Sequence, residues 1–241
     1  MTPRPDPAPV TSPDPRERVA HTLPRGEAIL ADQDGFERAL SDLARLDPRL
    51  APILAATGAP RLRRRAAGFA GLAGIVIAQQ VSAASARAIE ARLTAVLGGE
   101  PDAARVLAAG EAGLRAGGLS TPKIRTLAAL ARSVDAGNLD FERLHALPSP
   151  AARAALVALP GIGPWTAEVY LLFALGRADA FPAGDLAVQI AAAEALGHPE
   201  RLAAPALEAI AEDWRPLRGV AAQLLWAYYA SRRAGRGAPP A

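Results

Sequence analysis

The sequence predicts an all-α fold, and three observations support that prediction. Half of the 241 residues are hydrophobic (51%), Ala and Leu are abundant, and only 5% of the residues are aromatic. Ala and Leu favour helices, whereas strands are enriched in aromatic and β-branched residues. Apolar residues also recur every three or four positions. No stretch alternates apolar and polar residues for long enough to indicate a strand.

The first helices are expected after a proline-rich start. Seven prolines lie within residues 1–25, so this segment cannot propagate a helix and is expected to be a disordered tail. The spacing of Asp34 and Glu37 predicts a capping box at the start of a helix that ends at Asp47. A shorter helix is expected over residues 48–56.

A basic cluster and a buried helix come next. Four arginines lie within residues 61–65, and we interpret them as a solvated face, with DNA contact as the alternative. The apolar residues of the stretch 69–76 predict a buried helix. Ser82 is expected to cap the following helix, which should end at Gly98.

The remaining helices are shorter and are separated by glycine and proline. Ser120 or Thr121 should cap a helix near Lys123. We expect Lys123 to be an ordinary residue of that capped helix. A helix that starts at Asp185 should end at Gly197. Other helices are expected over residues 101–109, 111–116, 150–159, 165–175 and 205–213, and again around Leu224 and Trp226.

The length suffices for one large domain or for two small lobes that share a core. We expect this folded unit over residues 26–230, between the tail of residues 1–25 and a flexible tail of residues 231–241. The longest strongly apolar run, residues 66–78, is too short to span a bilayer. No signal peptide pattern opens the chain, so we expect a cytoplasmic protein.

Composition restricts the cofactors that the chain can hold. It contains no cysteine, which excludes disulfides, thiolate zinc sites and Cys-ligated iron–sulfur clusters. His21, His145 and His198 show no metal-ligand spacing. The net charge of +3 is compatible with a polyanionic partner but indicates little by itself.

Residues 159–163, Leu-Pro-Gly-Ile-Gly, predict a helix-hairpin-helix. The two glycines allow backbone angles that other residues avoid and leave no side chain between the backbone and a ligand. Pro164 suits the first turn of the second helix. The amides of the turn and of that helix would face outward together, an arrangement that suits an anionic oxygen. The alternative is a tight interhelical turn without function.

This hairpin, together with Phe-Pro-Ala-Gly-Asp at residues 181–185, resembles the helix-hairpin-helix-Gly/Pro-Asp (HhH-GPD) DNA glycosylases. Ile-Ala-Gln-Gln-Val-Ser at residues 77–82 and Trp-Arg-Pro-Leu-Arg at residues 214–218 are similar to motifs of the 3-methyladenine DNA glycosylase II branch. The resemblance covers about residues 30–230. It implies a two-lobed helical fold with an active-site cleft between the lobes, without the extra N-terminal α/β domain that some members carry.

The resemblance also implies roles for individual residues. Asp185 matches the catalytic residue, and Gln80, with Gln79 beside it, matches the wedge that fills the gap left by a flipped nucleotide. The residues that match the phosphate-binding hairpin are Gly161, Ile162, Gly163 and Thr166. Those that match the base pocket are Trp165, Val169 and Trp226. Backbone carbonyls that match a monovalent cation site, for Na⁺ or K⁺, belong to Val157, Leu159 and Ile162.

Simpler interpretations stand beside these roles. Asp185 alone would be read as a helix cap, and Gln79 and Gln80 as ordinary polarity at a helix end. Trp226 alone would be read as a core residue, and we expect a structural role for Trp214.

The residue types suit base excision chemistry. When a purine leaves deoxyribose, positive charge develops on the sugar, and a carboxylate such as that of Asp185 can stabilise it. Bifunctional relatives carry a Schiff-base lysine at the position of Trp165. Tryptophan cannot act as that nucleophile, so we expect hydrolysis without strand cleavage.

The predicted function is removal of alkylated purines, such as 3-methyladenine, from duplex DNA in base excision repair. One alternative is a monofunctional glycosylase for hypoxanthine or uracil, and another is a lesion-binding protein without activity. The expected partner is damaged double-stranded DNA, bound by a monomer in a bacterial nucleoid. No cofactor is expected to be required.

Overall fold

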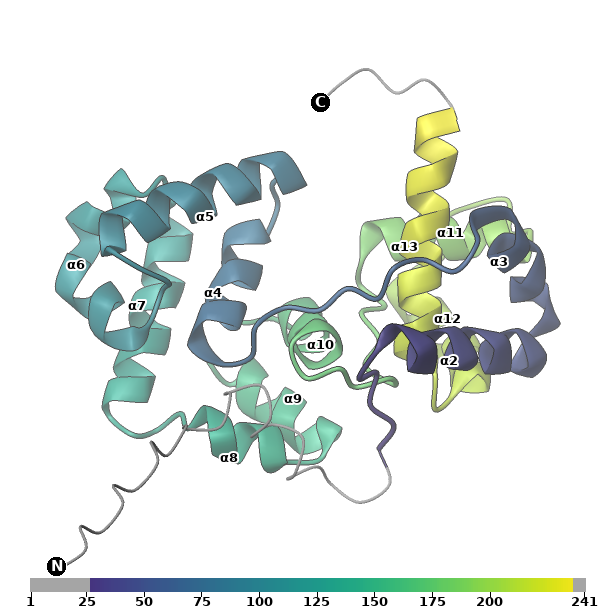
Figure 1. The fold of residues 1–241 in the computed structure, drawn as a ribbon, viewed down its shortest axis with the longest axis horizontal. Helices are drawn as coiled ribbons and strands as arrows, with labels where there is room; N and C mark the ends of the chain where they lie inside the picture. Colours follow the sequence, from purple (N-terminus) through teal and green to yellow (C-terminus); the bar gives the residue numbers. More distant parts are fainter. Residues whose placement is uncertain (1–26, 236–241) are drawn as a thin grey trace, which may run out of the picture.

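The computed structural model describes residues 27–235 and is shown in Figure 1. Over these residues the regular secondary structure is helical, apart from one isolated antiparallel bridge between Ile29 and Arg177. The predicted all-α fold is therefore confirmed. The tail expected over residues 1–25 lies outside the described residues. Within the described part, every helix is too short or too polar to span a bilayer.

One lobe is assembled from the two ends of the described chain, on the right of Figure 1. Helix α13 packs against α2, α3 and α11, so segments that are distant in sequence share one core. The elements are α2 (Gln33–Leu46), η2 (Pro48–Leu50), α3 (Ala51–Thr57), α11 (Leu186–Leu196), α12 (Ala204–Ala211), η3 (Glu212–Trp214) and α13 (Arg218–Gly235).

The other lobe is built from the middle of the chain. Its helices are α4 (Gly68–Ala78), α5 (Ala83–Leu97), α6 (Ala103–Ala116), α7 (Thr121–Asp135), α8 (Phe141–Ala146) and α9 (Ser149–Val157). Helix α10 (Pro164–Phe173) lies between the lobes in Figure 1 and packs against α4 and α9. Seven of its ten residues are buried, so both lobes pack around this helix.

The linker of residues 58–67 crosses between the lobes and is pinned along its length. The Leu62 amide donates to Gln33 of α2 at 2.7 Å, and the Arg65 amide donates to the Phe173 carbonyl of α10 at 2.9 Å. The Arg63 amide donates to Gln223 of α13 at 3.3 Å. The crossing segment is thereby fixed to α2 and α13 of one lobe and to the helix between the lobes.

Trp214 has the structural role that we predicted. Its side chain is fully buried, and its indole nitrogen donates to the Asp47 carboxylate at 2.8 Å. This bond joins η3 to the segment before η2. Hydrogen bonds from Arg49 and then from Trp214 lower the pKa of Asp47 to about 2, although burial opposes this shift.

Two boundaries differ from the predictions, and one predicted break is confirmed. The N-cap of α2 is Asp32, whose carboxylate accepts the Gly35 amide at 2.7 Å, so the capping box predicted from Asp34 is wrong. The break between the helices predicted over residues 101–109 and 111–116 is confirmed, because Gly110 within α6 has a non-helical backbone (φ 57°, ψ −171°) that separates two helical segments. Helix α13 reaches Gly235, so residues 231–235 of the expected tail are helical.

Candidate active site

Asp185 lies where the loop after α10 enters α11, and its carboxylate caps that helix. Oxygen Oδ1 accepts the backbone amides of Ala187 at 2.9 Å and Val188 at 3.1 Å. An N-cap aspartate satisfies amides that have no partner within the helix. Asp185 therefore does cap the helix, as the simpler interpretation states, but capping accounts for only part of the contacts of Asp185.

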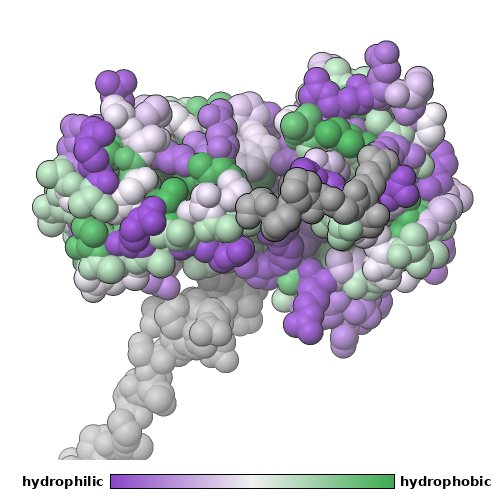
Figure 2. Space-filling model, turned by 90° about the horizontal axis from the view of Figure 1, so that it is seen from above, coloured by the Kyte–Doolittle hydropathy of each residue, from purple (hydrophilic) through white to green (hydrophobic). Residues whose placement is uncertain are grey.

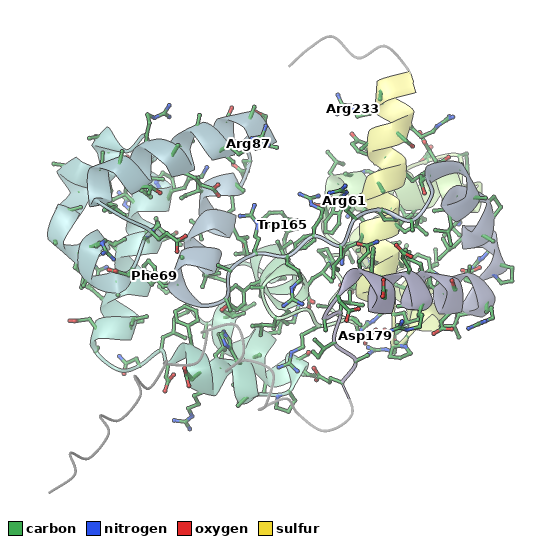
Figure 3. The ribbon with its side chains drawn as sticks, viewed as in Figure 1. Arg61, Phe69, Arg87, Trp165, Asp179 and Arg233 are labelled. Carbon is green, nitrogen blue, oxygen red and sulfur yellow. The ribbon has the colours of Figure 1, made fainter. Side chains whose placement is uncertain are left out.

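Two tryptophans complete the surroundings of the Asp185 carboxylate. Trp165 of α10 donates its indole N–H to Oδ2 at 2.8 Å, and Trp226 of α13 donates to Oδ1 at 3.0 Å. With the two backbone amides, the carboxylate accepts four hydrogen bonds from three helices. All four partners are N–H donors, and carboxylate oxygens accept them. Asp185 remains partly exposed, and Figure 3 shows Trp165 between the lobes.

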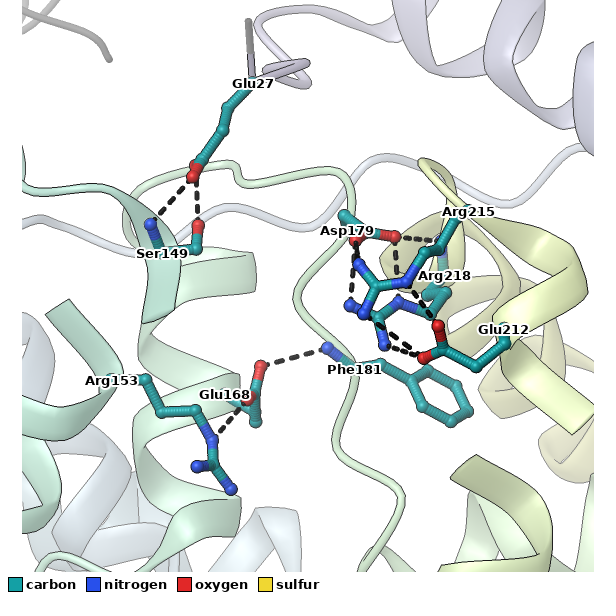
Figure 4. Close-up of polar contacts among 9 residues, drawn as sticks. All are labelled: Glu27, Ser149, Arg153, Glu168, Asp179, Phe181, Glu212, Arg215 and Arg218. Carbon is teal, nitrogen blue, oxygen red and sulfur yellow. Dashed lines mark hydrogen bonds and ion pairs between the residues drawn. The ribbon is translucent and has the colours of Figure 1, made fainter. Parts of the chain in front are cut away.

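The loop that carries Asp185 is held in place by polar contacts, several of which are drawn in Figure 4. The Phe181 amide donates to Glu168 of α10 at 3.0 Å, and Asp179 pairs with Arg215 at 2.7 Å and Arg218 at 2.8 Å. Burial raises the pKa of Glu168, although Arg153 opposes the shift. These contacts fix the loop from the helices on both sides.

A cavity of about 540 Å³ opens beside this network. It is lined by the same ion-paired residues, and neither Asp185 nor the two tryptophans that contact it line the cavity. The cavity therefore belongs to the support of the loop and is separate from the candidate active site.

An aromatic group extends from Trp226. Its ring lies 5.4 Å from that of Phe173, at an interplanar angle of 30°. The Arg63 guanidinium lies 5.4 Å from the centroid of the Phe173 ring and has no ion-pair or hydrogen-bond partner among residues 27–235. Burial, and then the charge of Arg65, lower the pKa of Arg63. Sequence analysis identified neither Phe173 nor Arg63 as a site residue.

Val169 does not reach the surface. It follows Trp165 by one helical turn, but it is only 5% exposed and is packed into the core. Of the three residues predicted to form the base pocket, Trp165 and Trp226 contact Asp185, whereas Val169 is buried in the core.

The hairpin between α9 and α10 has the predicted geometry. The Leu159 carbonyl accepts the Ile162 amide at 3.1 Å, and Ile162 is buried. Gly161 has a φ of +79°, and a Cβ there would lie 1.9 Å from the Thr126 hydroxyl. Gly163 is the N-cap of α10 and provides no side-chain cap, so the first amides of the helix are available to an anion.

The structure separates residues that we had grouped together. Thr166 is 2% exposed, and its hydroxyl accepts the Gln79 side chain at 2.8 Å. Because the Thr166 side chain is buried, Thr166 can offer only its backbone amide to an anion. Gln79 is engaged by the hairpin, whereas Gln80 is exposed.

Lys123 has a contact that the sequence analysis did not predict. Its ammonium donates to the carbonyl of Ile77, near the end of α4, at 2.7 Å, and burial lowers its pKa. Ser120 is the N-cap of α7, as expected, but its side chain makes no capping bond.

The backbone oxygens predicted to hold a cation lie at the hairpin. Val157 ends α9, where carbonyl groups lack partners within the helix, and the Leu159 carbonyl has one lone pair left after accepting the Ile162 amide. Hard oxygen donors of this kind suit a monovalent cation. Among the described side chains, no group of three or more His, Asp or Glu residues could hold a metal ion.

Comparison with known proteins gives consistent matches. Residues 73–217 match the family model of the HhH-GPD superfamily base excision DNA repair proteins. A probable bifunctional transcriptional activator and DNA repair enzyme AlkA of Mycobacterium tuberculosis is 36% identical over 214 residues. That alignment covers 82% of this chain and 40% of the relative, so the chain spans less than half of that protein.

Solved structures match over most of the chain. The DNA-3-methyladenine glycosidase of Bacillus halodurans is 28% identical with a TM-score of 0.72, covering 81% of this chain and 91% of the other. The 3-methyladenine DNA glycosylase of Schizosaccharomyces pombe, in complex with abasic DNA, is 25% identical with a TM-score of 0.73. It is covered to 98%, and this chain to 83%.

Proposed function

The chain belongs to the HhH-GPD superfamily of base excision DNA repair proteins, and from this membership we propose that it hydrolyses the N-glycosidic bond of alkylated purines, such as 3-methyladenine, in duplex DNA. The observation that carries the proposal is the carboxylate of Asp185, which is oriented by N–H donors of three helices. It lies between the lobes, close to the hairpin that opens α10.

The mechanism follows from the charge of the departing base and sugar. As the purine leaves, positive charge develops on deoxyribose, and a fixed carboxylate stabilises that charge without having to reorganise. The four hydrogen bonds to Asp185 provide the fixed orientation. Trp165 and Trp226 offer aromatic faces beside it, and a cationic alkylated purine is attracted to such faces. No step of this mechanism requires a cofactor.

Damaged duplex DNA would be held from both lobes. The uncapped amides of α10 and the backbone of Gly161 to Gly163 would bind a phosphate. The carbonyls of Val157, Leu159 and Ile162 would hold a monovalent cation, whose positive charge would support that contact. Figure 3 shows Arg61, Arg87 and Arg233 around the space above Trp165. In Figure 2, hydrophilic and apolar residues are mixed over this face of both lobes. Specific side chains and amides, more than a uniform charge, would therefore orient the DNA.

Base release from a defined duplex tests the function and the reaction type together. A duplex with one 7-methylguanine should lose that base and keep both strands unbroken until alkali cleaves the abasic site. Borohydride should trap no covalent adduct, because Trp165 cannot form a Schiff base. A trapped adduct would contradict the hydrolytic mechanism. Tight binding without base release would instead indicate a lesion-binding protein.

Arg63 favours a second candidate substrate, a neutral base such as hypoxanthine. Its unpaired guanidinium already lies over Phe173, beside Trp226. A cation at this place repels a cationic base, whereas guanidinium N–H groups match the O6 and N7 acceptors of a 6-oxopurine. The aromatic group would then select neutral lesions with an acceptor edge over cationic ones.

Removal of the Arg63 charge should shift the substrate preference of the enzyme towards cationic bases. We expect Arg63→Leu to raise the ratio of 7-methylguanine to hypoxanthine release by roughly three- to tenfold, because one nearby repulsion is lost. The measurement is single-turnover release from two duplexes that differ only in the lesion. Arg61→Leu, which removes an exposed charge from the same linker, is the matched control and should leave the ratio unchanged. An unchanged ratio in Arg63→Leu would argue against the second candidate.

A further inference from the structure

Gln79 and Gln80 are adjacent, but their environments differ. Gln79 is the C-cap of α4, and its side-chain nitrogen donates to the Thr166 hydroxyl at 2.8 Å and to the Gly161 carbonyl at 3.4 Å. Gln80 is exposed and has a φ of +56°, which residues other than glycine rarely adopt. Gln79 therefore contacts the hairpin, whereas Gln80 extends from a backbone that must be held in an unfavourable conformation.

The chemistry of the Gln79 contact is specific to an amide. The side-chain nitrogen carries two N–H groups, and its two partners are both oxygens. The side-chain nitrogen of Gln79 thus donates hydrogen bonds both to a hydroxyl of α10 and to a backbone carbonyl of the hairpin turn. A carboxylate at this place would set an acceptor against the Gly161 carbonyl.

Helix α7 provides a second connection between the same two segments. Lys123 and Thr126 are three residues apart, so they lie on one face of α7. Lys123 holds the Ile77 carbonyl at the end of α4, and Thr126 is buried against Gly161 of the hairpin. The end of α4 and the hairpin are therefore fixed relative to each other without DNA.

We propose that Gln79 is a positioning residue that couples the phosphate-binding hairpin to the wedge residue Gln80, and that Gln79 is not itself part of the wedge. This inference rests on the proposed function. A wedge fills the gap in the base stack only at a fixed distance from the strand, and the phosphate bound by the hairpin provides the reference point. Because one peptide bond joins Gln79 to Gln80, the contact of Gln79 with the hairpin also fixes the position of Gln80.

A double-mutant cycle between the two partners tests the coupling. Gln79→Met and Thr166→Val keep the shape and remove the hydrogen bond. Each should slow single-turnover base release from a duplex with a paired lesion by roughly three- to tenfold, the effect of one lost hydrogen bond. Because both variants break the same contact, the double variant should be no slower than the slower single variant. Gln79→Glu should be slower than Gln79→Met.

A second substrate distinguishes the loss of wedge positioning from a general loss of enzyme activity. In a duplex with the same lesion opposite an abasic-site analogue, flipping breaks no base pair and costs less. There we expect Gln79→Met, Thr166→Val and their double variant to stay within about twofold of the wild-type rate, because the wedge contributes less. Melting temperatures are measured in parallel and should remain close to that of the wild type.

The matched control is Gln80→Ala, which removes the wedge and leaves the Gln79–Thr166 bond intact. Because the Gln79–Thr166 bond acts through the wedge, adding Thr166→Val to Gln80→Ala should cause little further loss on the paired lesion. The proposal would be overturned if the effects of Thr166→Val multiplied with those of Gln79→Met or of Gln80→Ala, or if the effects were equal on both duplexes. A wild-type protein that releases base from neither duplex would overturn the proposed function and this inference with it, so the two failures are distinguishable.

Discussion

Asp185→Asn should slow base release by about 10²–10³-fold, the usual cost of one lost electrostatic interaction in a transition state. The side chain keeps its shape but no longer carries the negative charge that faces the developing sugar cation. Lesions whose glycosidic bond is already weakened by a positive charge should retain more activity than neutral ones. The measurement is single-turnover release of both kinds of base.

The structure predicts a side effect of this variant that has to be controlled. If the asparagine oxygen keeps the Ala187, Val188 and Trp226 contacts, its NH₂ group faces the indole N–H of Trp165. Two donors would then oppose each other, at a cost of about 1–3 kcal/mol in stability. Adding Trp165→Phe removes this conflict. The double variant should recover stability without recovering activity, whereas recovery of activity would show that Asp185 acts only through the fold.

Gly161→Ala should destabilise the protein and abolish its binding to duplex DNA. The left-handed backbone costs a non-glycine residue about 1–2 kcal/mol, and overpacking against Thr126 adds about 1–3 kcal/mol. Together these costs correspond to a decrease of several degrees in melting temperature for a domain of this size. Because the turn must also move, its amides no longer point at a common phosphate.

The hairpin offers its own control for this prediction. Gly163 has a φ of −89°, and a Cβ there would meet nothing within 4 Å. Gly163→Ala should therefore keep the wild-type melting temperature, and DNA binding is compared between the two variants by titration of an abasic duplex. Equal melting temperatures for the two variants would contradict the steric argument.

Local patterns were sufficient for most helices. Helix ends follow from nearby residues such as Ser82 and Gly197, which do cap α5 and end α11. The start of α2 was misplaced because Asp32 and Asp34 are both capable of capping, and the choice depends on which amide each carboxylate reaches. The length of α13 was underestimated for a different reason, since its last turn is exposed and continues the helix beyond the packed part, where Arg232 pairs with Glu194 of α11 at 3.6 Å.

The sequence by itself determined the helical class, the hairpin of residues 159–163 and the place of Asp185 at the start of a helix. These features depend on glycine, proline and capping residues that act within a few positions of one another. Only the tertiary structure decided that Trp165 and Trp226 donate to Asp185, that Gln79 bonds to Thr166, and that Arg63 lies over Phe173. Such contacts join segments far apart in the chain, and their geometry is set by the packing of both lobes around α10, which no local pattern of residues records.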